Sequence, residues 1–257
     1  MDSQMLIHDM VVPVSAERHG DWSLEPAHNF GWCAIANSVP LMTVEFFNAA
    51  SEYAIVFANT DAGVMSSVIL GVRRDENLYL TARGSWRAAY LPAFVRRYPF
   101  AYSLSDDGGN FALCVDESFP YFNIEGRGKR LFNDDKQPTP YVARMLRLIE
   151  QYRFEFQRTR AFCSKLVEFD LLEPLHIDSV SGGSPCDGMM VVNRDRARSM
   201  TPSQVSDLAR SDEFGLLHLH FHSMRHFPAT SGGRVSIAAS PENRLPVFLA
   251  GQSESRI

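Results

Sequence analysis

One long amphipathic helix in the second half of the chain constrains the fold more than any other feature. Thr139-Pro140 marks its start, with threonine at the N-cap and proline at the first helical position. Apolar and small side chains then recur at spacings of three and four, which predicts a helix of about 30 residues and about 45 Å in length. The residues of this stripe are Tyr141, Met145, Leu148, Tyr152, Phe156, Thr159, Cys163 and Leu166. The solvent-exposed face is predicted to consist of Arg144, Arg147, Glu150, Arg153, Glu155 and Arg158.

The first half of the chain predicts an antiparallel sheet that this helix covers. Residues 100–104 and 111–115 alternate apolar with small or polar side chains on either side of Asp106-Asp107-Gly108-Gly109, a pattern typical of a β-hairpin. A short helix is predicted over residues 43–50, with Thr43 as its N-cap. Further strands are predicted at residues 11–15, 22–24, 53–58, 66–72 and 77–81.

The rest of the second half predicts a strand pair followed by two helices. Residues 175–180 and 189–192 form the strand pair around a glycine-rich turn. A capping box of Thr201 and Gln204 begins a helix that ends near Ser211, and a last helix is predicted over residues 214–226. These elements indicate a single α+β domain over residues 1–227. The polar, aperiodic residues 228–257 are expected to form a flexible tail.

Composition and charge exclude several classes of protein. The chain has 257 residues with 45% hydrophobic and 21% charged side chains, which is typical of a soluble globular protein. Its net charge of -5 argues against a dedicated nucleic-acid binder. Residues 1–10 lack the basic start and apolar run of a secretory leader, so we expect none, and no apolar run approaches the length of a membrane span. Its 4 cysteines form no C-x-x-C pair, so we expect free thiols and a cytoplasmic protein.

Aromatic and arginine side chains are concentrated in residues 84–104. A short helical turn is predicted over residues 91–98, between two prolines. Burial statistics favour core packing for the rings. The alternative is recognition, because a guanidinium binds carboxylates bidentately and stacks on aromatic rings. The candidate binding residues of this stretch are Trp86, Tyr90, Arg96, Arg97 and Tyr98, with Arg87 beside them.

A histidine cluster near the end of the chain consists of His218, His220, His222 and His226. On a strand the first three would share one face and form a feasible metal set. On a helix, which the flanking pattern favours, His218, His222 and His226 share a face and His220 points elsewhere. The cluster contains no H-E-x-x-H glutamate and no obvious third ligand. We therefore expect partly buried or surface imidazoles and no metal.

Other candidate groups are a loop cysteine and three acidic pairs. Cys186 would need His176 nearby in space to act as a nucleophile, and an incidental loop cysteine is the favoured interpretation. Asp106-Asp107 is explained by the hairpin turn, and Asp134-Asp135 lacks the ligand spacing of a calcium loop. Asp116-Glu117 directly follows a strand and is the better candidate for the rim of a pocket. No nucleotide fingerprint is present, so no cofactor is expected.

Several segments occur in an order known from one protein family. The most specific are Val39-Pro40-Leu41 followed by Glu45-Phe46, and residues 90–100. Supporting segments are residues 131–135 with Pro138-Thr139-Pro140, and residues 214–224, which carry His220 and Ser223. In this order the chain resembles the bacterial SapC family from Val12 to Met224, and the family typically keeps a histidine and a serine that match His220 and Ser223.

This resemblance implies only general roles. The family takes its name from an association with bacterial surface (S-layer) proteins. Many members look like cytoplasmic proteins encoded near TonB-dependent receptors and flavin-dependent tryptophan halogenase-like enzymes. The family supplies no agreed catalytic residues.

Two hypotheses about function follow. In the first, this is a non-catalytic binding or accessory protein that recognises a peptide or partner protein, such as a flavin-dependent halogenase or its substrate. In the second, it is an enzyme or metalloprotein with a site around His220, Asp116 and Glu117. An aromatic concave surface without converging titratable groups would favour the first hypothesis. His220 within hydrogen-bonding reach of the acidic pair would favour the second.

Overall fold

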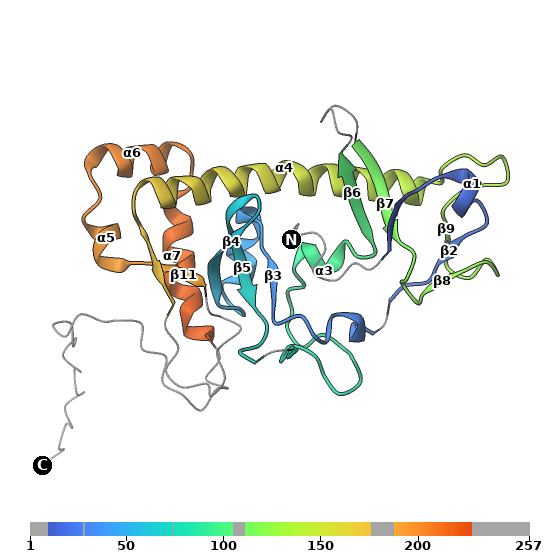
Figure 1. Cartoon of the computed structure of the whole chain (residues 1–257), viewed down its shortest axis with the longest axis horizontal. Coiled ribbons are helices and arrows are strands. Elements are labelled where there is room, and N and C mark those ends of the chain that lie inside the picture. Colours follow the sequence, from blue (N-terminus) through green and yellow to red (C-terminus); the bar gives the residue numbers. More distant parts are fainter. Residues whose placement is uncertain (1–9, 28, 74, 105–110, 176–187, 228–257) are drawn as a thin grey trace, which may run out of the picture.

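Helix α4 (Pro140–Glu168) runs along the long axis of the molecule, and three antiparallel sheets of the described residues are arranged along it (Figure 1). The computed structural model describes residues 10–27, 29–73, 75–104, 111–175 and 188–227. The fold class is α+β, as the sequence predicts. The predicted hairpin turn at residues 106–109 and the predicted tail at residues 228–257 lie outside the described residues.

The 29 residues of α4 confirm the long helix. Its N-terminal half buries Val142 and Ile149 in one hydrophobic core, and its C-terminal half buries Phe162 and Leu166 in another. The helix therefore joins two cores. One detail of the prediction is wrong: Glu155 is buried rather than solvent-exposed, because α4 packs on that side against the 3₁₀ helix η3 (Thr43–Glu45).

A five-stranded antiparallel sheet with the order β10-β11-β4-β5-β3 forms the centre of the molecule. Three of its strands come from the first half of the chain, as predicted, and two come from the second half. The strand pair near residue 175 is formed, but it begins at Leu172, and residues 176–187 lie outside the described part. The strands are β3 (Ser38–Pro40), β4 (Ile55–Thr60), β5 (Gly63–Ile69), β10 (Leu172–Pro174) and β11 (Met189–Val192).

Two smaller antiparallel sheets have the orders β1-β7-β6 and β8-β2-β9. The pairing of β6 with β7 confirms the predicted hairpin. Residues 77–81 form no strand. Leu80 makes only an isolated bridge to Trp86, because the Asn77 side chain accepts from the Tyr79 N–H and turns the backbone there. The strands are β1 (Val11–Pro13), β2 (Ser23–Leu24), β6 (Phe100–Leu104), β7 (Phe111–Asp116), β8 (Phe122–Asn123) and β9 (Lys129–Arg130).

Short helices connect the strands and close the C-terminal end. The predicted capping box is confirmed, since Gln204 Oε1 accepts from the Thr201 N–H at 2.8 Å. Thr43 is not an N-cap: it is the first residue of η3, and the preceding residue, Met42, donates its N–H to Glu45. The remaining helices are α1 (Ala16–His19), η2 (Gly31–Cys33), α2 (Phe46–Ala49), α3 (Ala93–Arg96), α5 (Arg194–Arg198), α6 (Pro202–Arg210), α7 (Phe214–Ser223) and η4 (Met224–His226).

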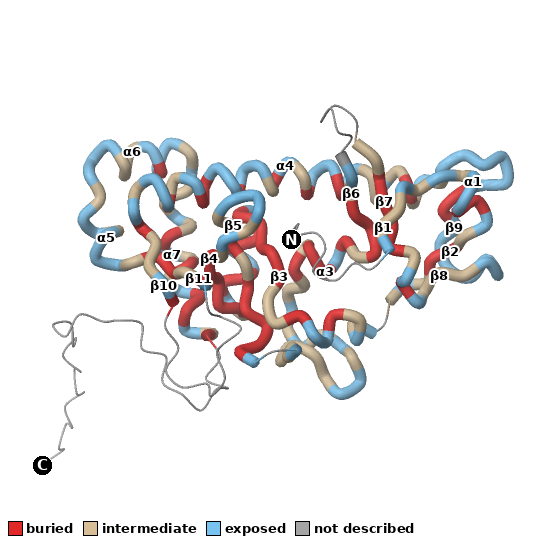
Figure 2. Tube along the Cα trace, viewed as in Figure 1, coloured by how far each residue is buried: buried red, intermediate tan, exposed pale blue. Residues whose placement is uncertain are grey.

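Burial is most continuous in the central sheet (Figure 2). Tyr53, Ile55, Val56 and Phe57 are fully buried in and just before β4. A helix that could cross a membrane would have to be longer and more apolar than any helix of the described residues.

Candidate functional site

The segment that carries the predicted binding residues is held to the central sheet by the residues just before β4. The Tyr53 hydroxyl accepts from Trp86 Nε1 at 2.8 Å and donates to the Tyr90 carbonyl. The Glu52 carboxylate accepts from the backbone N–H groups of Ala89 and Tyr90, at 2.6 and 2.9 Å. Trp86 therefore has a structural role, and the Tyr90 backbone is held by hydrogen bonds at both its N–H and its carbonyl.

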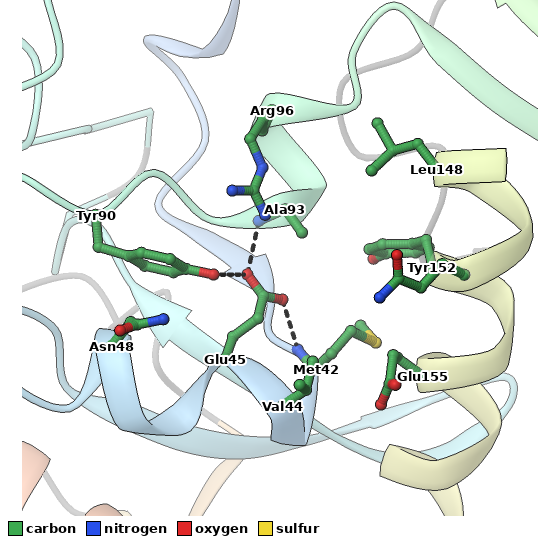
Figure 3. Close-up of a pocket in the computed structure, with 11 residues that line it drawn as sticks. Met42, Val44, Glu45, Asn48, Tyr90, Ala93, Arg96, Leu148, Tyr152 and Glu155 are labelled. Carbon is green, nitrogen blue, oxygen red and sulfur yellow. Dashed lines mark hydrogen bonds between the residues drawn. The ribbon is translucent and has the colours of Figure 1, made fainter. Parts of the chain in front are cut away.

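Glu45 organises the floor of the site (Figure 3). Its side chain is 3% exposed, and Oε1 accepts from the Tyr90 hydroxyl and from the Ala93 N–H, each at 2.7 Å. Oε2 accepts from the Met42 N–H at 3.0 Å. Ala93 is the first residue of α3, so this carboxylate also satisfies a free N–H at the start of that helix. Glu45 thus joins η3, α3 and the Tyr90 segment.

Above this floor lies an open pocket of about 260 Å³ between α3, the η3–α2 segment and α4 (Figure 3). Its inner wall includes Met42 and Leu148, and its mouth carries the exposed side chains of Val44, Asn48 and Gln151. Burial raises the pKa of Tyr90, the Glu45 carboxylate raises it further, and the nearby Arg96 guanidinium lowers it. The full lining consists of Met42, Val44, Glu45, Asn48, Tyr90, Ala93, Arg96, Leu148, Gln151, Tyr152 and Glu155.

The two adjacent arginines of the predicted binding stretch have opposite environments. Arg96 is exposed and lines the pocket. Arg97 is 1% exposed, its Nη1 donates to the Phe100 carbonyl at 2.7 Å, and its guanidinium carbon lies 4.8 Å from the Phe94 ring centre. The same carbon lies 4.9 Å from the Tyr152 ring centre. Arg97 is therefore a core residue, and the expectation that both arginines serve a binding surface is corrected.

Tyr98 and Asp116 form a structural pair away from the pocket. The Tyr98 hydroxyl donates to Asp116 Oδ2 at 3.1 Å, and its ring stacks on Trp32 with 4.1 Å between ring centres. Asp116 is fully buried, and Oδ1 also accepts from the Met10 N–H at 3.1 Å and the Ser118 hydroxyl at 2.6 Å. The pair fixes the cis Tyr98-Pro99 segment and the start of β1 against the end of β7.

Glu117, which was predicted to act with Asp116, points instead toward α1. Arg18 donates to both of its carboxylate oxygens, and His19 Nε2 lies 3.0 Å from Oε1. The hydrogen bond from Arg18 is the main reason why the pKa of Glu117 lies below its ordinary value. His19 is fully buried, and no periodicity in so short a segment distinguishes it in the sequence.

His220 is buried between two strands of the central sheet. Its Nδ1 lies 2.9 Å from the Ile55 carbonyl and its Nε2 lies 3.1 Å from the Val192 N–H. Because the Val192 N–H can only donate, Nε2 carries the lone pair and Nδ1 carries the proton. Ser223 completes the contact by accepting from the Ile55 N–H at 3.0 Å. Burial lowers the pKa of His220 to about 4.

The structure does not bring His220 together with Asp116 and Glu117. Helix α7 and strand β7 lie toward opposite ends of α4 (Figure 1), and each of the three side chains has other partners. Among the described residues, no group of three or more histidine, cysteine or acidic side chains could hold a metal ion. His218 and His222 are exposed, and Asp134 pairs with Arg130 at 2.7 Å. Cys186 and His176 lie outside the described residues.

A comparison with protein families gives a match to SapC over residues 14–229. The chain belongs to the SapC family. The match covers α4, all of the central sheet and every lining residue of the pocket. Neither a curated protein nor a solved structure matches this SapC chain.

Sequence reasoning missed most of the pocket of this SapC protein. The sequence places Glu45 in the first turn of the predicted helix at residues 43–50 and in a family segment, and a carboxylate three residues after Met42 is in addition a capping-box position. Asn48 and Gln151 carry no signal of their own, because exposed amides are ordinary on helix surfaces. The spacing along α4 predicts that Glu155 lies on the solvent-exposed face, but its side chain lines the pocket. Its Oε2 lies 3.3 Å from Arg158 Nη1.

Proposed function

We propose that this SapC-family protein is a non-catalytic binding or accessory protein that recognises a peptide or a partner protein through the pocket between α3, the η3–α2 segment and α4. The observation that carries the proposal is the exposed guanidinium of Arg96 beside a preformed open pocket. A guanidinium at the rim of a concave site is suited to bind a carboxylate of a partner.

The other ionisable groups that line the pocket support binding rather than acid–base chemistry. Both oxygens of Glu45 accept hydrogen bonds from the protein itself, and Glu155 is paired with Arg158. The pKa of Tyr90 is raised, first by burial, so its hydroxyl stays protonated and serves as a donor to Glu45. These groups hold the pocket in shape, and preorganisation of this kind favours affinity because little ordering is required on binding.

The family resemblance suggests where to look for the partner. We place it in a bacterial pathway associated with TonB-dependent receptors and tryptophan halogenase-like flavoenzymes, with such a flavoenzyme or its substrate as the first candidate. A cytoplasmic location is supported by the chemistry of Cys33, Cys114 and Cys163, which are buried free thiols.

The proposal is tested by filling the pocket. Gln151 and Gln157 are both exposed on α4, but only Gln151 lines the pocket. A tryptophan in the variant Gln151→Trp occupies the opening, whereas Gln157→Trp adds the same ring elsewhere on the helix. The tagged full-length chain and both variants are purified from cells that naturally contain it, and co-purifying proteins are quantified by mass spectrometry.

We expect at least one protein to be recovered with the unaltered chain and with Gln157→Trp, and about tenfold less with Gln151→Trp, the loss that about 1.4 kcal/mol of binding free energy produces. Equal recovery with all three chains would overturn the assignment of the pocket as the recognition site.

A further inference from the structure

A row of exposed side chains on α4 passes the mouth of the pocket. Its members follow one another at spacings of three and four residues, so they share one face of the helix. All of them are exposed, and Gln151 also lines the pocket. We name this row the basic stripe; it consists of Arg144, Arg147, Gln151, Phe154 and Arg158.

The pocket lining and the basic stripe together carry four guanidinium groups and two carboxylates, which belong to Glu45 and Glu155. Arg96 adds a guanidinium from α3, across the pocket from α4 (Figure 3). Within the described residues, no carboxylate forms an ion pair with Arg96, Arg144 or Arg147, and Glu155 pairs only with Arg158. Glu150, three residues after Arg147, is the one other acidic neighbour along this part of α4. A local excess of positive charge on a chain with a net charge of -5 indicates a partner surface of negative charge.

Apolar side chains are interspersed with these charges. Phe154 is 61% exposed within the basic stripe, and Val44, at the pocket mouth, is 57% exposed. Phe47, three residues after Val44, is 79% exposed. A polyphosphate or a nucleic acid backbone would gain little from such side chains, whereas a peptide can place its own apolar side chain against them.

The length of the basic stripe sets the length of its ligand. Arg144 and Arg158 are 14 positions apart, which corresponds to about 21 Å along a helix. An extended peptide covers that distance with about six residues.

We propose that the pocket and the basic stripe together bind an acidic, extended peptide segment of a partner protein, with apolar side chains of the peptide placed against Phe154 and Val44. This inference rests on the proposed function and specifies the chemistry of the ligand. Arg96 binds a carboxylate at the pocket, and Arg144 and Arg147 bind further carboxylates along α4.

The test is a selection from a phage-displayed library of random dodecapeptides on the full-length chain. It is repeated with a triple variant, Arg96→Gln, Arg144→Gln and Arg147→Gln, and with Arg160→Gln, which removes an exposed charge from another face of α4. Selected peptides are synthesised, and their dissociation constants are measured by fluorescence anisotropy at low and high NaCl.

We expect the selected sequences to be enriched in Asp and Glu around apolar residues. Their affinity should fall about 30-fold or more in the triple variant, since each charge-assisted contact accounts for about threefold to tenfold, and should be unchanged in Arg160→Gln. It should also weaken at high NaCl.

Two results would overturn this inference and leave the proposed function standing. One is selection of neutral or basic peptides whose binding is abolished by Gln151→Trp but not by the triple variant. The other is tighter, arginine-dependent binding of a single-stranded oligonucleotide or of anionic lipid vesicles than of any selected acidic peptide. A selection that yields no peptide above background, with co-purification unchanged by Gln151→Trp, overturns both proposals.

Discussion

The imidazole of His220 lies between the Ile55 carbonyl and the Val192 N–H, two groups that the strand register would otherwise pair. It donates from Nδ1 to the Ile55 carbonyl at 2.9 Å. β11 and β4 pair Met189 with Ala58 and Met190 with Phe57, so the same register places Val192 opposite Ile55. At this point, however, Val192 donates to His220 Nε2 and Ile55 donates to Ser223 Oγ. Helix α7 thus completes the end of the sheet with two side chains.

Replacement of His220 by alanine should strongly destabilise the protein. The Ile55 carbonyl and the Val192 N–H would both lose their partner in a buried environment, and a cavity would remain. We expect a loss of about 3–5 kcal/mol in the free energy of unfolding, measured by urea denaturation. His218→Ala, on the exposed side of the same helix, should change it by less than about 0.5 kcal/mol. Equal effects of the two substitutions would contradict this role of His220.

Acid should weaken the fold through the same imidazole. The pKa of His220 is lowered by burial from 6.5 to about 4, so between these values the unfolded chain binds a proton that the folded chain does not. The contribution of His220 is therefore fully present above pH 6.5 and is lost as the pH falls toward 4. The expected loss is about 3 kcal/mol.

The control for this pH dependence is His220→Asn, which keeps a donor for Ile55 but has no group that titrates in this range. Urea denaturation of the unaltered protein and of His220→Asn between pH 7.5 and 4.5 gives the free energy of unfolding as a function of pH, and the two slopes are compared. Parallel stability curves for the two proteins would show that His220 does not titrate as described.

The parts of the fold that the sequence predicted are those encoded locally. Spacings of three and four residues predicted α4, a capping box predicted α6, and alternation predicted the β6–β7 hairpin. The composition of the central sheet could not be predicted in this way, because β11 pairs with β4 across more than half of the chain. Periodicity does not encode which distant strand is the neighbour.

The candidate site, too, could be predicted only where the signal is local in the sequence. The sequence singled out the stretch around residue 96 correctly as rich in guanidinium and aromatic groups, and Arg96 and Tyr90 do line a pocket. It could not separate Arg96 from Arg97, because α3 has only 4 residues and a helix that short has no readable stripe. The burial of Arg97 depends on Tyr152, a residue 55 positions away whose ring it contacts.

This difference between the two arginines predicts different effects of the same substitution. Arg97→Met keeps an unbranched side chain but removes the hydrogen bond to the Phe100 carbonyl and the contacts of the guanidinium with two rings. We expect a loss of about 2–3 kcal/mol in the free energy of unfolding. Arg96→Met should leave this free energy within about 0.5 kcal/mol, because its side chain is exposed. A larger loss of unfolding free energy for Arg96→Met than for Arg97→Met would contradict the assignment of Arg97 to the core and of Arg96 to the rim of the pocket.

Glu45 accepts three hydrogen bonds, from the Met42 N–H, the Tyr90 hydroxyl and the Ala93 N–H. Glu45→Ala leaves the N–H groups of Met42 and Ala93 without their acceptor, and we expect a loss of about 3 kcal/mol in the free energy of unfolding. Tyr90→Phe removes one donor and keeps the ring, so its cost should be about 1 kcal/mol. Glu45→Gln retains one acceptor oxygen but turns an NH₂ group toward a backbone donor, and its effect should fall between these two. Urea denaturation of the three variants gives this order directly. A Glu45→Ala protein as stable as Tyr90→Phe would mean that the carboxylate does not hold η3 and α3 together.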